Sequence, residues 1–170
     1  MKFTYEPLPI KCLGEIVTGS TPSSSSPEMF GDAYPFITPT DMEYSKRHID
    51  TARWLSDSAM EVMGRRLLPE GSVCVVCIGA TIGKICLTSE PSISNQQINS
   101  VIVNRESHDN SFVYYLLLTK ITSLKAIASG AATPIINKTS FSEVMVKVPP
   151  LPLQRKITSI LSAYDDLIEN

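Results

Sequence analysis

Runs of apolar residues separated by polar and proline-rich turns predict a chain of mixed strands and helices. They predict strands over residues 34–38, 73–78, 82–88, 98–103 and 144–148. Apolar positions three or four residues apart predict an amphipathic helix over 111–128, closed by Gly130. Ser56 or Ser58 is expected to cap a short helix that ends near Gly64. The pattern indicates an α+β fold, in which helices flank a mixed or antiparallel sheet.

The end of the chain predicts a coiled-coil-type helix that starts after Pro152. Its apolar positions follow the spacing 4, 3, 4, 3 of a heptad seam, formed by Leu153, Ile157, Ile160, Tyr164 and Leu167. About 18 residues are too few for a stable coiled coil alone. We therefore expect the natural helix to continue or to pair with a second helix; the alternative is a helix folded back on its own domain. Residues 1–150 are assigned to one domain and 151–170 to the start of this helix.

Composition places the chain among folded proteins without a targeting segment. It has 170 residues, of which 43% are hydrophobic and 19% charged. No window approaches the roughly 18 apolar residues of a membrane helix, and the first residues lack a signal-peptide core, so a cytoplasmic location is expected. The net charge is -2, but residues 46–66 carry +2 and residues 110–160 carry +5. These stretches form either a basic face for a polyanion or ordinary solvated surface.

Motifs for catalysis or metal binding are missing from the sequence. The four cysteines include Cys74 and Cys77, but alternation along a buried strand would place these two on opposite faces, which favours core packing over a metal or thiol site. Residues 79–84 have two glycines and a lysine without the spacing of a phosphate-binding loop, so a structural turn is favoured. A small thiol or metal enzyme would need Cys74 and Cys77 together, and no metal site is predicted.

An ordered set of segments resembles the target recognition domain of the specificity subunit of type I restriction-modification enzymes. The segments are residues 13–22, 35–42, 68–73, 79–84, 94–97, 129–133 and 148–157. The resemblance implies a non-catalytic DNA-reading subunit in a prokaryotic cytoplasm. Its partners would be double-stranded DNA, modification subunits that use S-adenosylmethionine, and a restriction subunit that uses ATP and Mg²⁺; none of these cofactors is expected to bind this chain.

The resemblance also implies how two recognition domains are spaced. Specificity subunits are similar to two copies of this unit in tandem, whose long helices pair as a spacer between two half-sites. This sequence departs from that pattern because it has a single copy. It is then either a fragment with one recognition domain or a half-subunit that dimerises through its last helix. A module that docks partners through that helix and ignores DNA is the alternative function.

Candidate contact residues are chosen by side-chain chemistry and position. Hydrogen-bonding side chains suited to base edges are Thr38, Thr40, Gln96, Gln97 and Asn137. Cations suited to phosphates are Lys46, Arg47, Arg65, Arg66, Lys84 and Lys138. Structural alternatives exist for several of them: a hydrogen-bonded pair supporting loops for the glutamines, a turn for Lys84, and electrostatic capping of a helix for Arg65 and Arg66.

Overall fold

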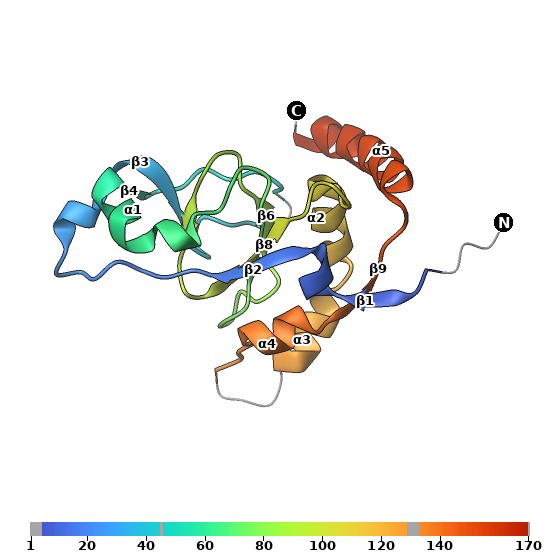
Figure 1. Ribbon diagram of the computed structural model, residues 1–170, viewed down its shortest axis with the longest axis horizontal. Coiled ribbons are helices and arrows are strands. Elements are labelled where there is room, and N and C mark those ends of the chain that lie inside the picture. Colours follow the sequence, from blue (N-terminus) through green and yellow to red (C-terminus); the bar gives the residue numbers. More distant parts are fainter. Residues whose placement is uncertain (1–4, 45, 129–132, 170) are drawn as a thin grey trace.

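The computed structural model describes residues 5–44, 46–128 and 133–169 (Figure 1). In these residues nine strands form three sheets, of order β1-β9, β2-β8-β5-β6 and β4-β3-β7. The strands are β1 (Pro7–Pro9), β2 (Gly14–Thr18), β3 (Phe30–Ile37), β4 (Trp54–Leu55), β5 (Val73–Val76), β6 (Ile85–Leu87), β7 (Ile93–Ser94), β8 (Ile98–Val103) and β9 (Met145–Lys147). The helices are α1 (Asp57–Met63), α2 (Asn110–Leu118), α3 (Ile121–Ala128), α4 (Lys138–Ser142) and α5 (Leu151–Glu169), with single 3₁₀ turns at Ile10–Leu13, Pro27–Met29 and Gly64–Arg66. The predicted α+β class is confirmed.

The antiparallel sheet β2-β8-β5-β6, called here the central sheet, is buried on both faces. Along β5, Val73 and Val75 point into the apolar cluster that holds the buried side chains of α2, α3 and α4. Cys74 and Val76 point into a second cluster on the other face, together with Ile37 from β3. Burial on both sides explains why the strand reads as a continuous apolar run instead of an alternating one.

The same alternation places the side chains of Cys74 and Cys77 on opposite faces of the sheet. Cys74 lies in the second cluster and Cys77 in the first, as predicted for opposite faces. Burial raises the pKa of the Cys77 thiol to about 11, and the Ser100 hydroxyl donates a hydrogen bond to Cys74 Sγ at 3.3 Å. No cluster of three potential metal ligands occurs among the described residues. Both cysteines therefore act as core side chains.

Residues 111–128 were predicted to form one continuous helix. The structure has two helices there, so the predicted continuity was wrong. α2 ends at Leu118 and α3 begins at Ile121. The Thr119 hydroxyl donates to the Leu116 carbonyl at 2.7 Å, and the Lys120 N–H bonds to the Leu117 carbonyl only three residues back. Such tightened turns interrupt the helical ladder and change its direction. Gly130, which was expected to close the helix, lies outside the described residues. So do residues 129–132 of the segment 129–133 that contributed to the family resemblance.

α1 belongs to a smaller layer beside the central sheet. Ala59 and Met63 of α1 pack with Phe36, Leu55 and Ile93 from the sheet β4-β3-β7. Ser56 is the N-cap residue by position, but its hydroxyl donates to the Glu28 carbonyl at 2.6 Å and makes no capping bond. The helix is therefore anchored mainly by its apolar face and by this link to the turn before β3.

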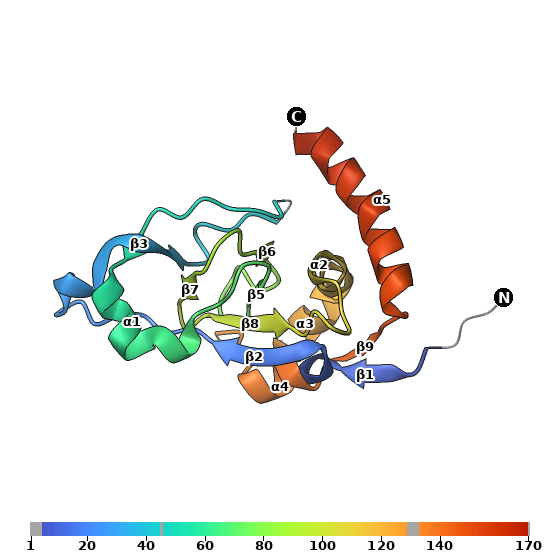
Figure 2. The same cartoon turned by 45° about the horizontal axis from the view of Figure 1, so that its top comes forward.

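α5 lies beside α2 (Figure 2), and polar side chains connect it to the rest of the domain. The buried Gln154 accepts a hydrogen bond from the Asp109 N–H at 3.0 Å and donates to the carbonyls of Pro149 and Ser107. One turn later the Thr158 hydroxyl donates to Asp109 Oδ1 at 2.8 Å. The predicted seam faces elsewhere: Leu153 and Ile157 are partly buried, whereas Ile160, Tyr164 and Leu167 are 52%, 62% and 77% exposed. Packing of α5 on the domain thus leaves the later part of the apolar stripe, from Ile160 to Leu167, uncovered.

Different helices lie near the two ends of the central sheet. At one end β2 and β5 finish and β8 and β6 begin, because all neighbouring pairs are antiparallel. This end lies toward α1 in Figure 2 and is called the α1 end. The opposite end leads into α2, against which α5 packs, and is called the α5 end. No described helix is both long and apolar enough to cross a membrane.

Candidate nucleic-acid interface

An open cleft at the α1 end collects three of the predicted phosphate-binding cations. It has a volume of about 430 Å³ and is lined by Glu15, Ile16, Val17, Thr18, Val62, Arg65, Arg66 and Lys138. The cations come from two segments that are 72 residues apart, since Arg66 follows α1 and Lys138 begins α4. Glu15 is the one carboxylate among the lining residues, so the cleft carries net positive charge. A concave basic surface of this kind attracts polyanions.

The two arginines of the cleft differ in how firmly they are held. Both lie in the 3₁₀ turn Gly64–Arg66 that extends α1. Arg66 Nη1 donates to the Thr18 carbonyl at 2.6 Å, which fixes the guanidinium against the end of β2. Arg65 is exposed and makes no hydrogen bond or ion pair with the described part of the chain. One guanidinium is thus positioned in advance and the other remains available to a ligand.

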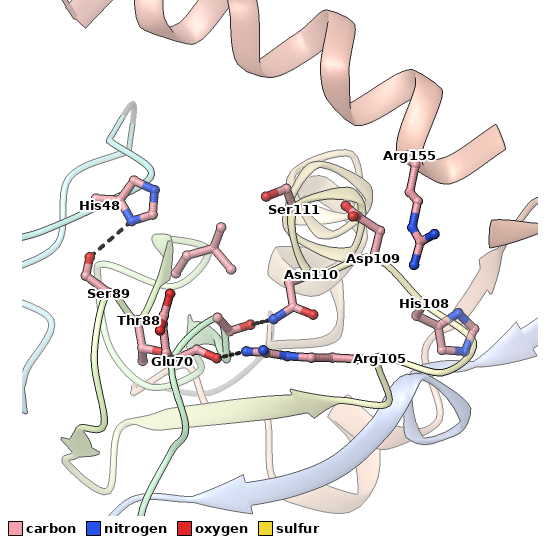
Figure 3. Close-up of a pocket in the computed structure, with 12 residues that line it drawn as sticks. His48, Glu70, Thr88, Ser89, Arg105, His108, Asp109, Asn110, Ser111 and Arg155 are labelled. Atoms are coloured by element: carbon pink, nitrogen blue, oxygen red, sulfur yellow. Dashed lines mark hydrogen bonds between the residues drawn. The ribbon is translucent and has the colours of Figure 1, made fainter. Parts of the chain in front are cut away.

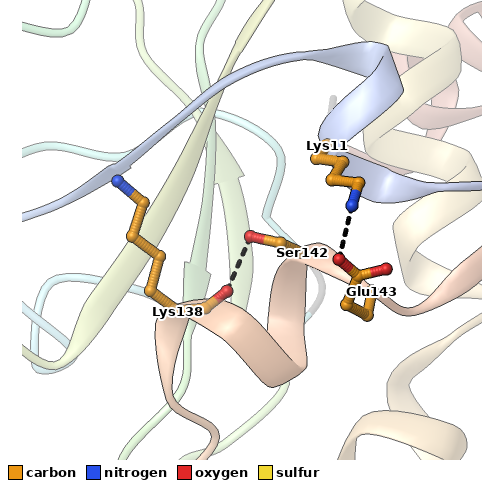
Figure 4. Close-up of polar contacts among 4 residues, drawn as sticks. All are labelled: Lys11, Lys138, Ser142 and Glu143. Atoms are coloured by element: carbon orange, nitrogen blue, oxygen red, sulfur yellow. Dashed lines mark hydrogen bonds and ion pairs between the residues drawn. The ribbon is translucent and has the colours of Figure 1, made fainter.

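Lys138 and Glu143, at the two ends of α4, point in different directions (Figure 4). Figure 4 shows that the side chain of Lys138 extends toward β2, whereas Glu143 faces Lys11. Lys11 Nζ donates to Glu143 Oε1 at 2.5 Å, and this contact raises the pKa of Lys11. Glu143 is thus paired with Lys11, and Lys138 makes no ion pair with the described residues, so its ammonium adds to the positive charge of the cleft.

Gln96 and Gln97 lie at the α1 end but have different roles. The exposed Gln96 accepts a hydrogen bond through Oε1 from the Thr21 hydroxyl, just beyond β2. Gln97 is partly buried: its Oε1 accepts from Asn95 Nδ2 at 3.0 Å, and its N–H donates to Asn95 Oδ1. Gln97 therefore supports the loop, which was the structural alternative for the pair, whereas Gln96 presents its amide at the surface.

Asn137 is the N-cap of α4. Its Oδ1 accepts the Ser140 N–H at 2.8 Å, although the side chain is exposed. We expect Asn137→Ala to lower the free energy of unfolding by about 1 kcal/mol, the typical value of an N-cap. Asn137→Asp keeps the cap oxygen and should retain most of this stability in urea denaturation. If the alanine variant is as stable as the parent protein, the capping role is wrong.

The two threonine candidates lie in a hydrogen-bonded segment after β3, and Lys84 donates a hydrogen bond to this segment. Thr38 is 5% exposed, and its hydroxyl donates to Asp41 Oδ2 at 2.6 Å. The exposed Thr40 lies 2.7 Å from it, hydroxyl to hydroxyl. Lys84 Nζ donates to the Pro39 carbonyl at 3.0 Å. Thr38 and Lys84 thus hold this segment in place, and their polar atoms are used within the fold.

The backbone of the turn that carries Lys84 is also held by hydrogen bonds within the fold. Gly79 and Gly83 have φ angles of 88° and 89°, which residues with a Cβ rarely adopt. The Gly79 N–H bonds to the Pro134 carbonyl and the Gly83 N–H to the Val76 carbonyl. These donors are therefore used within the fold, in agreement with the prediction of a turn.

Lys46 and Arg47 lie outside the cleft. Lys46 Nζ donates to Glu43 Oε1 at 2.7 Å in an exposed ion pair. Arg47 Nη1 donates to the hydroxyls of Tyr115 at 3.1 Å and Ser162 at 2.9 Å, so it connects its loop to α2 and α5. The structure thus gives Arg47 a connecting role that chain position alone did not suggest.

A second cavity, of about 470 Å³, lies at the α5 end (Figure 3). Arg105, Arg155 and His108 line it, but so do the carboxylates of Asp109 and Glu70. Arg105 donates to the Glu70 carbonyl, and Asn110 Nδ2 donates to the Gly71 carbonyl at 2.7 Å. In this cavity the two arginines are matched by two carboxylates, whereas the basic cleft has three cations and one carboxylate; none of the predicted contact residues lines this cavity.

Sequence reasoning missed Thr18, Thr21 and Val62 as parts of the α1 end. Thr18 and Thr21 lie in and just after β2, a strand that the apolar pattern did not predict. Its two consecutive apolar residues, Ile16 and Val17, are too few for a clear signal. Val62 reads as an ordinary apolar helix position, and only the fold shows that it faces the cleft.

Comparisons with known proteins agree with this architecture. Residues 4–170 match the family model of the type I restriction modification DNA specificity domain. The chain is 38% identical over 168 residues to the type I restriction enzyme HindI specificity subunit of Haemophilus influenzae, covering 93% of this chain and 36% of that protein. It is 33% identical over 165 residues to the MjaIX specificity subunit of Methanocaldococcus jannaschii, covering 95% and 38%.

Solved structures of low sequence identity share the fold. The HsdS subunit from Thermoanaerobacter tengcongensis superimposes with a TM-score of 0.71 at 20% identity, covering 97% of this chain and 37% of that one. A type I restriction-modification S subunit from M. genitalium gives 0.70 at 16% identity, covering 98% and 40%. The chain spans a little over a third of the curated relatives it matches. It belongs to the family of type I restriction-modification DNA specificity domains.

Proposed function

We propose that this chain binds DNA sequence-specifically and reads one half of a bipartite site for a type I restriction-modification system. The observation that supports this most is the basic cleft, in which Arg65, Arg66 and Lys138 converge from distant segments. The exposed Gln96 lies at the same end of the central sheet, just before the start of β8. The cations would bind phosphates and fix the position of the protein on the duplex. The side-chain amide of Gln96 would hydrogen-bond to a base edge, for which adenine is the usual partner of Gln. As a specificity domain the chain would itself be non-catalytic.

The domain division follows from this proposal. Residues 1–150 would form the target recognition domain, and residues 151–170 would begin the spacer helix. The exposed Ile160, Tyr164 and Leu167 would pair with an equivalent helix, from a second recognition domain or from a second copy of the chain. Modification subunits would supply S-adenosylmethionine, and the restriction subunit ATP and Mg²⁺, so no such cofactor should bind this chain.

Selection from random DNA duplexes tests the proposal. The protein, assembled with its modification subunit, should enrich a pair of short sequences at a fixed spacing, whereas the modification subunit alone should enrich none. Enrichment of no sequence by the assembled complex would count against DNA reading. If the complex nevertheless forms, the second candidate gains support: a docking module that uses the uncovered apolar stripe of α5.

A further inference from the structure

The exposed side of α1 and of the turn that follows it combines apolar, cationic and acidic side chains, with Glu61 exposed next to Val62. Ser58, Val62 and Arg65 are exposed and are spaced by four and three residues, which places them on one face of a helix. Ala59 and Met63 occupy the opposite face and pack in the apolar cluster beside β3. The face with Val62 is therefore free of the contacts that hold α1 in the fold.

Val62 is 70% exposed, although it lies inside the basic cleft. It does not belong to the apolar cluster that anchors α1, and valine is a weaker helix former than alanine or leucine. Single exposed apolar side chains are common on protein surfaces, and Val62 is distinguished from them by its place in the basic cleft. Its two methyl groups stand among the cations of Arg65, Arg66 and Lys138, so a polyanion bound by these cations would lie against them.

Among the DNA bases, thymine offers an apolar group at the major-groove edge, its C5-methyl. The major groove is wide enough to admit an α-helix, and α1 with its 3₁₀ extension covers residues 57–66 at the rim of the cleft. We infer that this helical segment enters the major groove and that Val62 reads the methyl group of a thymine. The inference rests on the proposed function and goes further, because it names the reading element and one base of the half-site.

Replacing thymine by deoxyuridine removes this methyl group and keeps the base pair. Each thymine of the selected duplex is replaced in turn, and binding by the complex with the modification subunit is measured. At one thymine position deoxyuridine should weaken binding by the parent protein about fourfold, as expected for one buried methyl-sized group. Val62→Ala should bind the thymine and deoxyuridine duplexes equally at this position.

Ile127→Ala is the matched control. Ile127 is also an exposed apolar residue on a helix, at 45%, but it does not line the cleft. This variant should discriminate thymine from deoxyuridine as the parent protein does. The inference is overturned if the selected half-site has no thymine, if no thymine is sensitive, or if the deoxyuridine effect persists in Val62→Ala. Each of these outcomes leaves DNA reading intact, whereas failure to select any sequence removes the proposed function itself.

Discussion

Replacing Gly19 with alanine is expected to lower the free energy of unfolding by about 3 kcal/mol, the upper range for an overpacked site. A Cβ at this position would lie 2.2 Å from both the Ser94 and the Asn95 carbonyl oxygens. Backbone atoms must then move, because they cannot rotate away as a side chain does. The Gly19 N–H also bonds to the Ile98 carbonyl at 3.1 Å, so the disturbance would reach the start of β8.

The same change should impair sequence selectivity, because the displaced segment leads into Gln96. Urea denaturation and binding to the selected duplex would measure the two effects. Gly64→Ala is the control: an added Cβ there meets nothing within 4 Å, and the backbone is helical. That variant should be more stable by about 0.5 kcal/mol. A Gly19→Ala protein with unchanged stability would contradict the close approach of these backbone segments.

Removing both cleft arginines, by Arg65→Ala with Arg66→Ala, should weaken binding to every DNA sequence by about tenfold for each lost phosphate contact. Each lost contact should also reduce the slope of log K against log salt by about 0.9. The preferred sequence should remain the same, because phosphates carry no sequence information. Binding titrations at several salt concentrations measure all three quantities.

Lys156→Ala provides the comparison for charge alone. Lys156 is exposed on α5, away from the cleft residues. Lys156→Ala removes one positive charge, as each arginine substitution does. It should nevertheless leave the slope of log K against log salt close to that of the parent protein. If the double arginine variant keeps the full slope, these side chains do not contact phosphates, and the cleft is not the interface.

Sequence patterns sufficed for the parts of the fold in which one signal dominates. The strand at 98–103 was predicted to the residue, and the opposite faces of Cys74 and Cys77 followed from simple alternation. The interruption of the helix after Leu118 was missed because it depends on local hydrogen bonds of Thr119. α4 was missed because five residues are too few to show helical periodicity.

The candidate site was harder to predict because it is made by distant segments. Arg66 and Lys138 share a cleft only after β2 and α4 have packed, and no spacing along the chain reveals this. Arg47 has the same side chain as Arg66, yet its loop directs it toward Ser162 of α5. Side-chain chemistry therefore chose suitable residue types, whereas tertiary packing decided which of them can meet a ligand.

The opposite placement of the basic cleft and α5 bears on how new specificities can arise. The cleft lies at the α1 end of the central sheet, and the hydrogen bonds of Gln154 and Thr158 that orient α5 lie at the other. Because substitutions at separated sites act nearly independently, the residues proposed to read DNA, Val62 and Gln96, can change without loosening the packing of α5. A lineage could thus acquire a new target sequence by a few surface substitutions, with the assembly of the enzyme preserved.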